Sequence, residues 1–120
     1  MNLEIRSLAD RGNHQKERLT LRCIDDTDMG HFALFQTSSR DGVVNTGVKR
    51  AMWFPDKLIQ KGDLVVVYTR SGTQSEKVLT TGKKAHFLYW GFAVPIWNED
   101  DSGAVLLHAP EWEARLAGSL

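Results

Sequence analysis

Alternating apolar and polar side chains mark the beginning of the chain as β-structure. In residues 3–8 the apolar positions 3 and 5 are separated by charged side chains, and residues 18–24 repeat this period of two. Such a period points one side chain to the core and the next to solvent, so each segment is predicted to be a strand. The polar residues 9–17 predict a loop, and residues 25–30 predict a turn.

The middle of the chain is more apolar and predicts more deeply buried strands. Residues 64–69, LVVVYT, form a continuous, mostly β-branched run, as expected for a central strand. Residues 31–36 predict a second apolar strand. Residues 48–54 predict a strand that Pro55 ends, because proline lacks a ladder donor. Residues 38–47, SSRDGVVNTG, are rich in turn formers and predict a loop.

The last third of the chain predicts shorter strands. Residues 70–85 are polar and predict a long loop. The strand-like pieces that follow are residues 86–90, 95–97 and 104–109. The tail, residues 110–116, begins with proline and predicts one or two helical turns.

Together these elements predict an all-β sandwich. They amount to about seven to nine short strands, with turn signals about every 8 to 12 residues and almost no helix except a short turn at the C-terminus. A chain of 120 residues is long enough for one domain and too short for two. Residues 1–120 are therefore expected to form a single sandwich domain.

Composition agrees with a soluble globular domain and narrows the possible partners. The chain is 42% hydrophobic and 25% charged, with a formal net charge of +0. Net charge alone therefore draws it neither to nucleic acid nor to an anionic membrane. A single cysteine, Cys23, excludes an intrachain disulfide. Leucines share its predicted face, which indicates a buried structural thiol rather than a nucleophile.

The sequence also bears on location. The first residues contain no apolar run of signal-peptide length, and no stretch approaches the about 18 apolar residues of a membrane span. We expect a cytoplasmic protein if the chain is full-length. An extracellular location becomes possible if the chain was excised from a larger one.

The acidic turn at residues 98–103 invites comparison with a calcium-binding loop. An EF-hand loop needs glycine at its sixth position and glutamate at its twelfth. Counted from Asn98, Gly103 is the sixth residue, but the twelfth is Ala109. The histidines show no zinc-ligand spacing either; they are His14, His31, His86 and His108. We expect a hairpin turn here, and neither a metal nor a cofactor.

No recognisable catalytic motif is present. The chain lacks a G-x-S-x-G elbow, a Walker loop and a dinucleotide-binding fingerprint. Its close carboxylate pairs lie in predicted loops, whereas acid–base catalysis needs a carboxylate held in a cleft. We therefore predict that the protein is not an enzyme. A weaker alternative is a small hydrolase or sugar-binding sandwich, with Trp90 or Trp97 in a cleft beside Asp100 and Asp101.

Positive charge gathers in the middle of the chain. Residues 40–90 carry a net charge of +5, whereas residues 91–120 carry −4. If the basic residues converge in the fold, they form a patch that suits phosphates and stacked bases. The alternative is that they protect a sheet edge from aggregation. The residues concerned are Lys49, Arg50, Lys83 and Lys84, with Trp53 and His86 as aromatic neighbours.

Five segments resemble the lamin tail domain family in their order and spacing. They are FALF (32–35), WFP (53–55), KGDLVVVYTRSG (61–72), YWG (89–91) and IWNEDDSGAVLL (96–107). The last, in which Trp97-Asn98 and an acidic turn precede an apolar strand, is the most specific. The resemblance is strongest over residues 18–109. It departs from the family at His31-Phe32, where the family has Gly-Trp, and at Pro110-Glu111-Trp112, which replaces a final hairpin.

The resemblance implies an immunoglobulin-like β-sandwich. Domains of this family are generally non-catalytic and serve as binding or tethering modules, so no catalytic residue carries over. The first hypothesis is accordingly a structural or binding module for a protein partner, with Trp53, Trp90 or Trp112 as candidate anchors. The second is a nucleic-acid-binding module that uses the basic segment 40–90. Burial of all four tryptophans with no apolar surface patch would count against the first hypothesis, and a lack of DNA binding at about 50 mM salt would count against the second.

Overall fold

The computed structural model describes all 120 residues and contains ten β-strands. Their bounds are β1 Leu3–Ala9, β2 Arg18–Cys23, β3 Thr27–Asp28, β4 Phe32–Arg40, β5 Val43–Trp53, β6 Leu58–Ile59, β7 Leu64–Tyr68, β8 Ser75–Val78, β9 Lys84–Tyr89 and β10 Gly103–His108. Two short 3₁₀ turns complete the structure, η1 at Met29–His31 and η2 at Ala117–Ser119.

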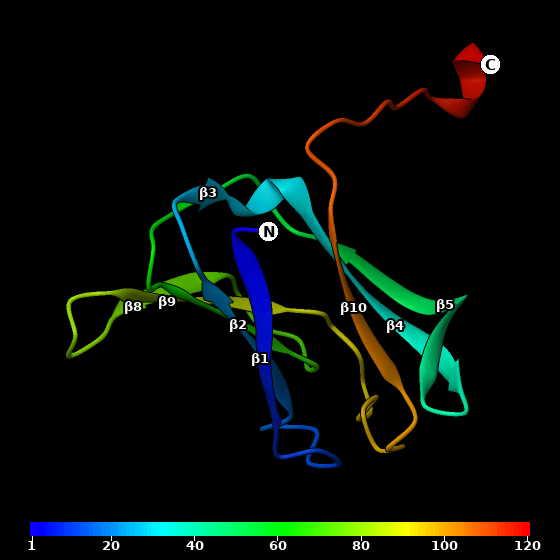
Figure 1. The fold of residues 1–120 in the computed structure, drawn as a ribbon, viewed down its shortest axis with the longest axis horizontal. Coiled ribbons are helices and arrows are strands. Elements are labelled where there is room, and N and C mark those ends of the chain that lie inside the picture. Colours follow the sequence, from blue (N-terminus) through cyan, green and yellow to red (C-terminus); the bar gives the residue numbers. More distant parts are fainter.

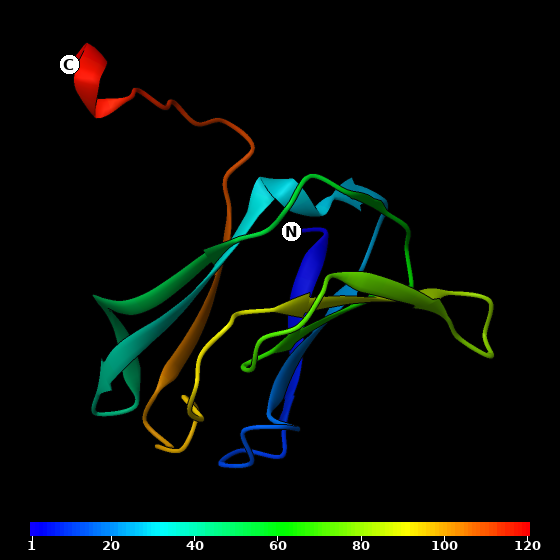
Figure 2. The same ribbon diagram turned by 180° about the vertical axis from the view of Figure 1, so that it is seen from behind.

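The strands form two main layers, which confirms the predicted all-β sandwich (Figure 1). One layer is a five-stranded sheet in the order β1-β2-β7-β9-β8, and the other is a three-stranded sheet in the order β10-β4-β5. The two-residue strands β3 and β6 pair separately. All neighbours are antiparallel except β7 and β9, which are parallel. Figure 2 shows from behind that the layers diverge toward the β8–β9 hairpin on one side and β5 on the other.

The core fills the space between the layers and follows the predicted alternation. Leu19, Leu21 and Cys23 point inward from β2, and Val65 and Val67 point inward from β7. Cys23 is fully buried, as its leucine neighbours indicated. Burying these core side chains removes apolar surface from water, which is the dominant favourable term in folding.

A buried glutamate, Glu17, joins the segment before the acidic turn to the loop before β2 and to the residue after β7. The Glu17 carboxylate accepts hydrogen bonds from the backbone N–H groups of Gly12, Ile96 and Trp97 and from the hydroxyl of Thr69. Burial alone would raise the pKa of Glu17, but these hydrogen bonds outweigh it and hold the pKa below its ordinary value. The carboxylate therefore fixes an irregular segment that has no strand partner.

The prediction of a loop at residues 38–47 is wrong. Strand β4 continues to Arg40 and β5 begins at Val43, so a two-residue turn joins them into a hairpin. Asp41 and Gly42 both have positive φ values, 53° and 79°, as a type I′ hairpin turn requires. The Asp-Gly pair between strands is the signal for this turn, and the turn-forming residues after it instead make bulges in β5.

Three other element predictions need correction. Residues 95–97 are not a strand, since side chains, the Glu17 carboxylate and the Gln36 amide, bind their backbone and no strand ladder does. The predicted loop at residues 70–85 contains the edge strand β8. The predicted helical turns at residues 110–116 are absent, and the single C-terminal turn lies at Ala117–Ser119. Residues 110–116 instead leave the body of the sandwich as an arm beyond β10 (Figures 1 and 2).

Candidate functional site

The outer face of the three-stranded sheet is apolar across all three strands. Because Phe32 and Leu34 point into the core, Ala33 and Phe35 point outward. Their neighbours across the sheet form two rows, Leu107–Ala33–Trp53 and Val105–Phe35–Ala51. We call these six residues, Ala33, Phe35, Ala51, Trp53, Val105 and Leu107, the apolar face. All six are at least partly exposed, so this layer is apolar on both sides.

Close packing defines one end of the apolar face. A Cβ on Gly103 would lie 2.5 Å from Thr37 Oγ1 and 2.6 Å from Val44 Cγ1, so only glycine lets these groups approach. Val44 therefore lies over the outer side of the sheet beside β10, and 49% of its surface is exposed. The apolar surface thus continues past the two rows toward the β4–β5 turn.

Two exposed tryptophans define the other end of the apolar face. Trp53 ends β5 and is 54% exposed, and its indole N–H donates to the carbonyl oxygen of Gly30 at 2.8 Å. Trp112, from the C-terminal arm, is 63% exposed and meets the Trp53 ring edge-to-face with 4.7 Å between ring centroids. The hydrogen bond fixes the Trp53 ring while about half of the residue stays exposed. The structure thus brings together two of the predicted anchors.

The outer face of the five-stranded sheet is different, because the chain covers its own aromatic residues there. Tyr68 and Tyr89 stack with 5.4 Å between ring centroids, and the Arg70 guanidinium lies 5.0 Å from each ring centroid. A Cβ on Gly72 would lie within 2.6 Å of the Tyr89 ring, so the backbone of this loop packs directly on it. Apolar side chains on an outer sheet face are normally covered or replaced by polar ones. The side chains of the apolar face are neither covered by another part of the chain nor replaced by polar ones.

The other two tryptophans serve the fold. Trp97 is 2% exposed and belongs to the core. Trp90 is half-buried against Phe92 and Trp97, and its indole N–H donates to the carbonyl oxygen of Ala51 at 3.2 Å, which links the end of β9 to β5. Neither lines the hollow of about 380 Å³ that contains Asp100 and Asp101. The arrangement expected for a sugar-binding or hydrolase cleft is therefore absent.

The four basic residues do not converge into one patch. Lys49 and Arg50 lie on β5, whereas Lys83 and Lys84 lie at the β8–β9 hairpin, on the opposite side of the molecule in both views (Figures 1 and 2). Arg50 donates to Gln36 Oε1 at 2.7 Å and lies 5.2 Å from the Phe92 ring centroid. Its charge is thereby directed toward the sandwich. The condition for a phosphate-binding surface is not met.

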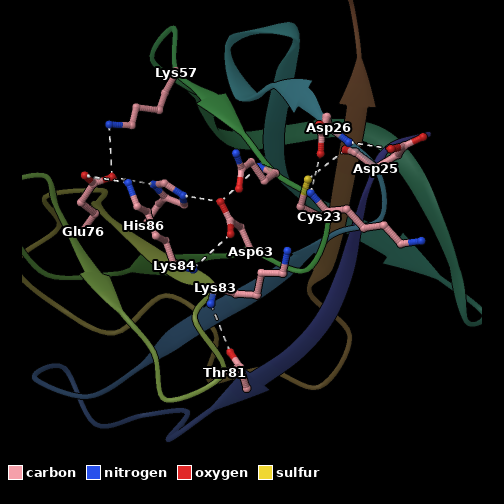
Figure 3. Close-up of polar contacts among 12 residues, drawn as sticks. Cys23, Asp25, Asp26, Lys57, Asp63, Glu76, Thr81, Lys83, Lys84 and His86 are labelled. Carbon is pink, nitrogen blue, oxygen red and sulfur yellow. Dashed lines mark hydrogen bonds and ion pairs between the residues drawn. The ribbon is translucent and has the colours of Figure 1, made fainter.

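His86 lies in a second cluster, between two carboxylates (Figure 3). Its Nε2 is 3.0 Å from Asp63 Oδ2, and its Nδ1 is 3.5 Å from Glu76 Oε2. Because an ionised carboxylate only accepts, Nε2 carries the hydrogen that is donated to Asp63. Lys57 and Lys84 each form an ion pair with Glu76, at 3.2 and 3.6 Å.

Asp63 is the buried centre of this cluster and joins two parallel strands. It precedes β7, and its carboxylate accepts hydrogen bonds from the backbone N–H groups of Gln60 and Lys84 as well as from His86. Burial raises the pKa of Asp63, but these three hydrogen bonds outweigh it and lower the pKa below its ordinary value. The hydrogen bond from Lys57 likewise lowers the pKa of Glu76. The cluster holds β7, β8 and β9 in register.

Acid is therefore expected to destabilise the protein through Asp63. A carboxyl whose pKa is lowered by folding stabilises fully above the unfolded pKa, about 3.9 for Asp, and this stabilisation is lost as pH falls through the folded value. In urea titrations between neutral pH and about pH 3, Asp63→Asn is expected to cost about 2 kcal/mol at neutral pH. It should also show a smaller further loss in acid than the wild type.

The control for this prediction is Asp101→Asn. Asp101 is exposed, and its side chain makes no hydrogen bond or ion pair. The substitution should leave both the neutral-pH stability and the acid dependence unchanged. An Asp63→Asn variant with the acid dependence of the wild type would show that the buried carboxylate is not the group responsible.

The single cysteine is not activated as a nucleophile. Burial raises the pKa of the Cys23 thiol to about 11, and the charge of Asp63 adds to the effect. A thiol with this pKa stays protonated near neutral pH and is a poor nucleophile. No group of three or more His, Cys, Asp and Glu side chains is placed to share a metal ion.

The sequence reading missed most of the apolar face. It singled out Trp53 and Trp112 but not Phe35, Val105 or Leu107. The signal was present in FALF and AVLL, two apolar runs without polar alternation. Such a run means that both sides of a strand are apolar, and it is usually read as full burial. Only the sheet order shows that no third layer covers the outer side.

Comparison with known proteins does not identify a family for this chain. No protein-family model matches the chain, and no curated protein matches it. No helix in the structure has the length and apolar character needed to cross a membrane. The function is therefore argued from the geometry of the chain itself.

Proposed function

We propose that this protein is a non-catalytic module that binds a protein partner through the apolar face. The observation that carries the proposal is an uncovered sheet surface of six apolar side chains with Trp53 at its edge. Contiguous exposed apolar surface on a soluble domain marks an interaction site. Tryptophan is enriched among the residues that dominate binding energy, and Trp53 is held in place by its hydrogen bond to Gly30.

The hydrogen bonding of the two most buried carboxylates supports the same function. The two most buried carboxylates, Glu17 and Asp63, accept hydrogen bonds from backbone N–H groups and from the side chains of Thr69 and His86. Groups committed in this way hold the fold and are not free to exchange protons with a substrate. Protein binding needs no reactive group, only an uncovered surface of suitable shape and polarity.

We further propose that the sandwich is related to the lamin tail domain. Phe54-Pro55 follows β5, Gly62 lies in the turn before β7, and residues 98–102 form the turn before β10. These are the positions that the resemblance expects. The parallel pairing of β7 and β9 is a departure, because immunoglobulin-type sheets are antiparallel. A strand-by-strand comparison of an experimental structure with a lamin tail domain tests the relationship, and a different strand order would contradict it.

The binding proposal is tested by placing one charge on the apolar face, at the β5 end of its second row. Ala51 is exposed, so Ala51→Glu should leave the stability nearly unchanged. A desolvated, unpaired carboxylate opposes association, and we expect the affinity for any protein partner to fall by about tenfold or more. The measurement is capture of proteins from a cell extract by immobilised wild-type and variant chains, followed by titration of each captured protein.

The matched control is Val78→Glu. Val78 is 63% exposed on β8, on the far side of the molecule from the apolar face. This variant carries the same new charge and should retain the wild-type partners. Equal capture by the wild type and both variants would show that the apolar face is not the binding surface.

A further inference from the structure

The C-terminal arm, residues Ala109–Leu120, has the pattern of a β-strand without a partner. Apolar side chains at Trp112, Ala114 and Leu116 alternate with charged ones at positions 111, 113 and 115. This period of two explains why no helix forms there, because a helix would spread these apolar residues around its circumference. In a β-strand conformation these apolar residues would share one side, and the charges would lie on the other.

The arm makes almost no use of its own sandwich. After the N–H of Ala109 bonds to His31, every hydrogen bond of the arm lies within the arm, between Arg115 and Leu120 or their neighbours. All of its residues are exposed, including Leu116 at 81% and Leu120 at 83%. In both ribbon views the arm continues past the end of β10 and away from the two sheets (Figures 1 and 2). Its apolar side is therefore not covered by its own chain beyond Trp112.

The arm and the apolar face match in size. From Trp112 to Leu116 an extended strand measures about 13 Å, at about 3.3 Å per residue. Three strands spaced about 4.8 Å apart measure about 10 Å from the first to the third. The apolar side of one arm is thus long enough to cross all three strands of an apolar face, with its charged side turned to solvent. Within one chain Trp112 packs on Trp53 at the rim of its own face, so arm exchange replaces this contact with the same contact on the second copy.

We infer that two copies of this chain associate by arm exchange, each laying its arm across the apolar face of the other. This inference rests on the proposed function, because it names a second copy as the partner of the apolar face. Each chain carries one uncovered apolar face and one apolar arm that leads away from it. A two-fold arrangement uses both features of both copies, so it closes without leaving a free site.

The first measurement is the mass of the purified 120-residue chain, by sedimentation from micromolar to several hundred micromolar concentration. We expect a dimer of twice the 13.5 kDa chain mass. Leu116→Glu and Ala51→Glu should each weaken the dimer by about tenfold or more, since each buries a charge at the exchanged contact. Val78→Glu should leave it unchanged. Because Leu116 and Ala51 are exposed in the single chain, all three variants are expected to fold.

The second measurement is disulfide cross-linking between two different variants. Ala51→Cys, enlarged by a peptide tag, is mixed with Ala114→Cys, and we expect an oxidised heterodimer at the summed mass. Mixing Lys77→Cys with Ala114→Cys should give none, because Lys77 lies on β8 in the other sheet. The native Cys23 is buried and does not compete.

Two results would overturn arm exchange. One is a monomer at every concentration. The other is a dimer that neither Leu116→Glu nor Ala51→Glu weakens, which would place the contact elsewhere. Either result leaves the protein-binding function to be decided by the capture experiment. A monomer whose captured partner is lost in Ala51→Glu would refute the second copy and retain the function.

Discussion

Replacing Glu17 with alanine is expected to lower the free energy of unfolding by about 4 kcal/mol, because it leaves several buried donors without an acceptor. The carboxylate accepts three backbone N–H groups and the hydroxyl of Thr69 at 2.5 to 3.2 Å. Two of the N–H groups, those of Ile96 and Trp97, belong to buried residues. Urea unfolding at neutral pH measures the effect.

Glu17→Gln separates charge from hydrogen bonding in this prediction. The amide oxygen of glutamine still accepts, but its NH₂ group does not, so we expect about half the loss, about 2 kcal/mol. The exposed Glu4 on β1 is the control, and Glu4→Ala should change the stability by less than about 0.5 kcal/mol. A loss below about 1 kcal/mol for Glu17→Ala would mean that water replaces the carboxylate and that the segment is not anchored as described.

Trp97→Ala is expected to cost about 4 kcal/mol as well, for a different reason. Trp97 is the largest fully buried side chain, and its removal leaves a cavity in the centre of the sandwich. The same substitution at Trp112 removes an exposed ring with one aromatic contact and should cost less than about 1 kcal/mol. Urea titrations of the two variants give the comparison directly.

Trp112→Ala, the variant with the small effect on stability, should have the larger effect on association. Trp112→Ala is expected to weaken the dimer, because Trp112 begins the apolar side of the arm. It should do so while the fold remains near wild-type stability. If Trp112→Ala unfolds the chain as readily as Trp97→Ala, the arm is part of the core and not a free binding element. If it leaves association unchanged, the arm does not form the contact.

The two buried carboxylates explain how a small sandwich holds irregular segments in place. Glu17 binds the segment before the acidic turn, and Asp63, which directly precedes β7, binds the start of β9. Each lies in a part of the sequence that reads as polar loop or turn. Neither anchor lies on the outer side of β10, β4 and β5. The stabilising polar groups and the candidate binding surface therefore lie on different parts of the molecule.

The sequence was most informative where one local pattern decides one local outcome. The alternation in residues 18–24 and the β-branched run 64–69 became β2 and β7, and the isolated Cys23 became a buried thiol. It was misleading where the same residue types serve two purposes. Asp41-Gly42 belongs to a tight hairpin turn and not a long loop. The charged alternation after Pro110 belongs to an extended arm and not a helix.

The sequence by itself determined that this chain is an all-β sandwich, because side-chain periodicity and turn residues act over a few neighbouring positions. Only the tertiary structure decided which apolar side chains remain uncovered. Phe32 and Phe35 look alike in the sequence, yet one is fully buried and the other lies on the apolar face. The difference depends on the order of strands and on the absence of a layer beyond β10, β4 and β5, which are long-range properties that no local pattern encodes.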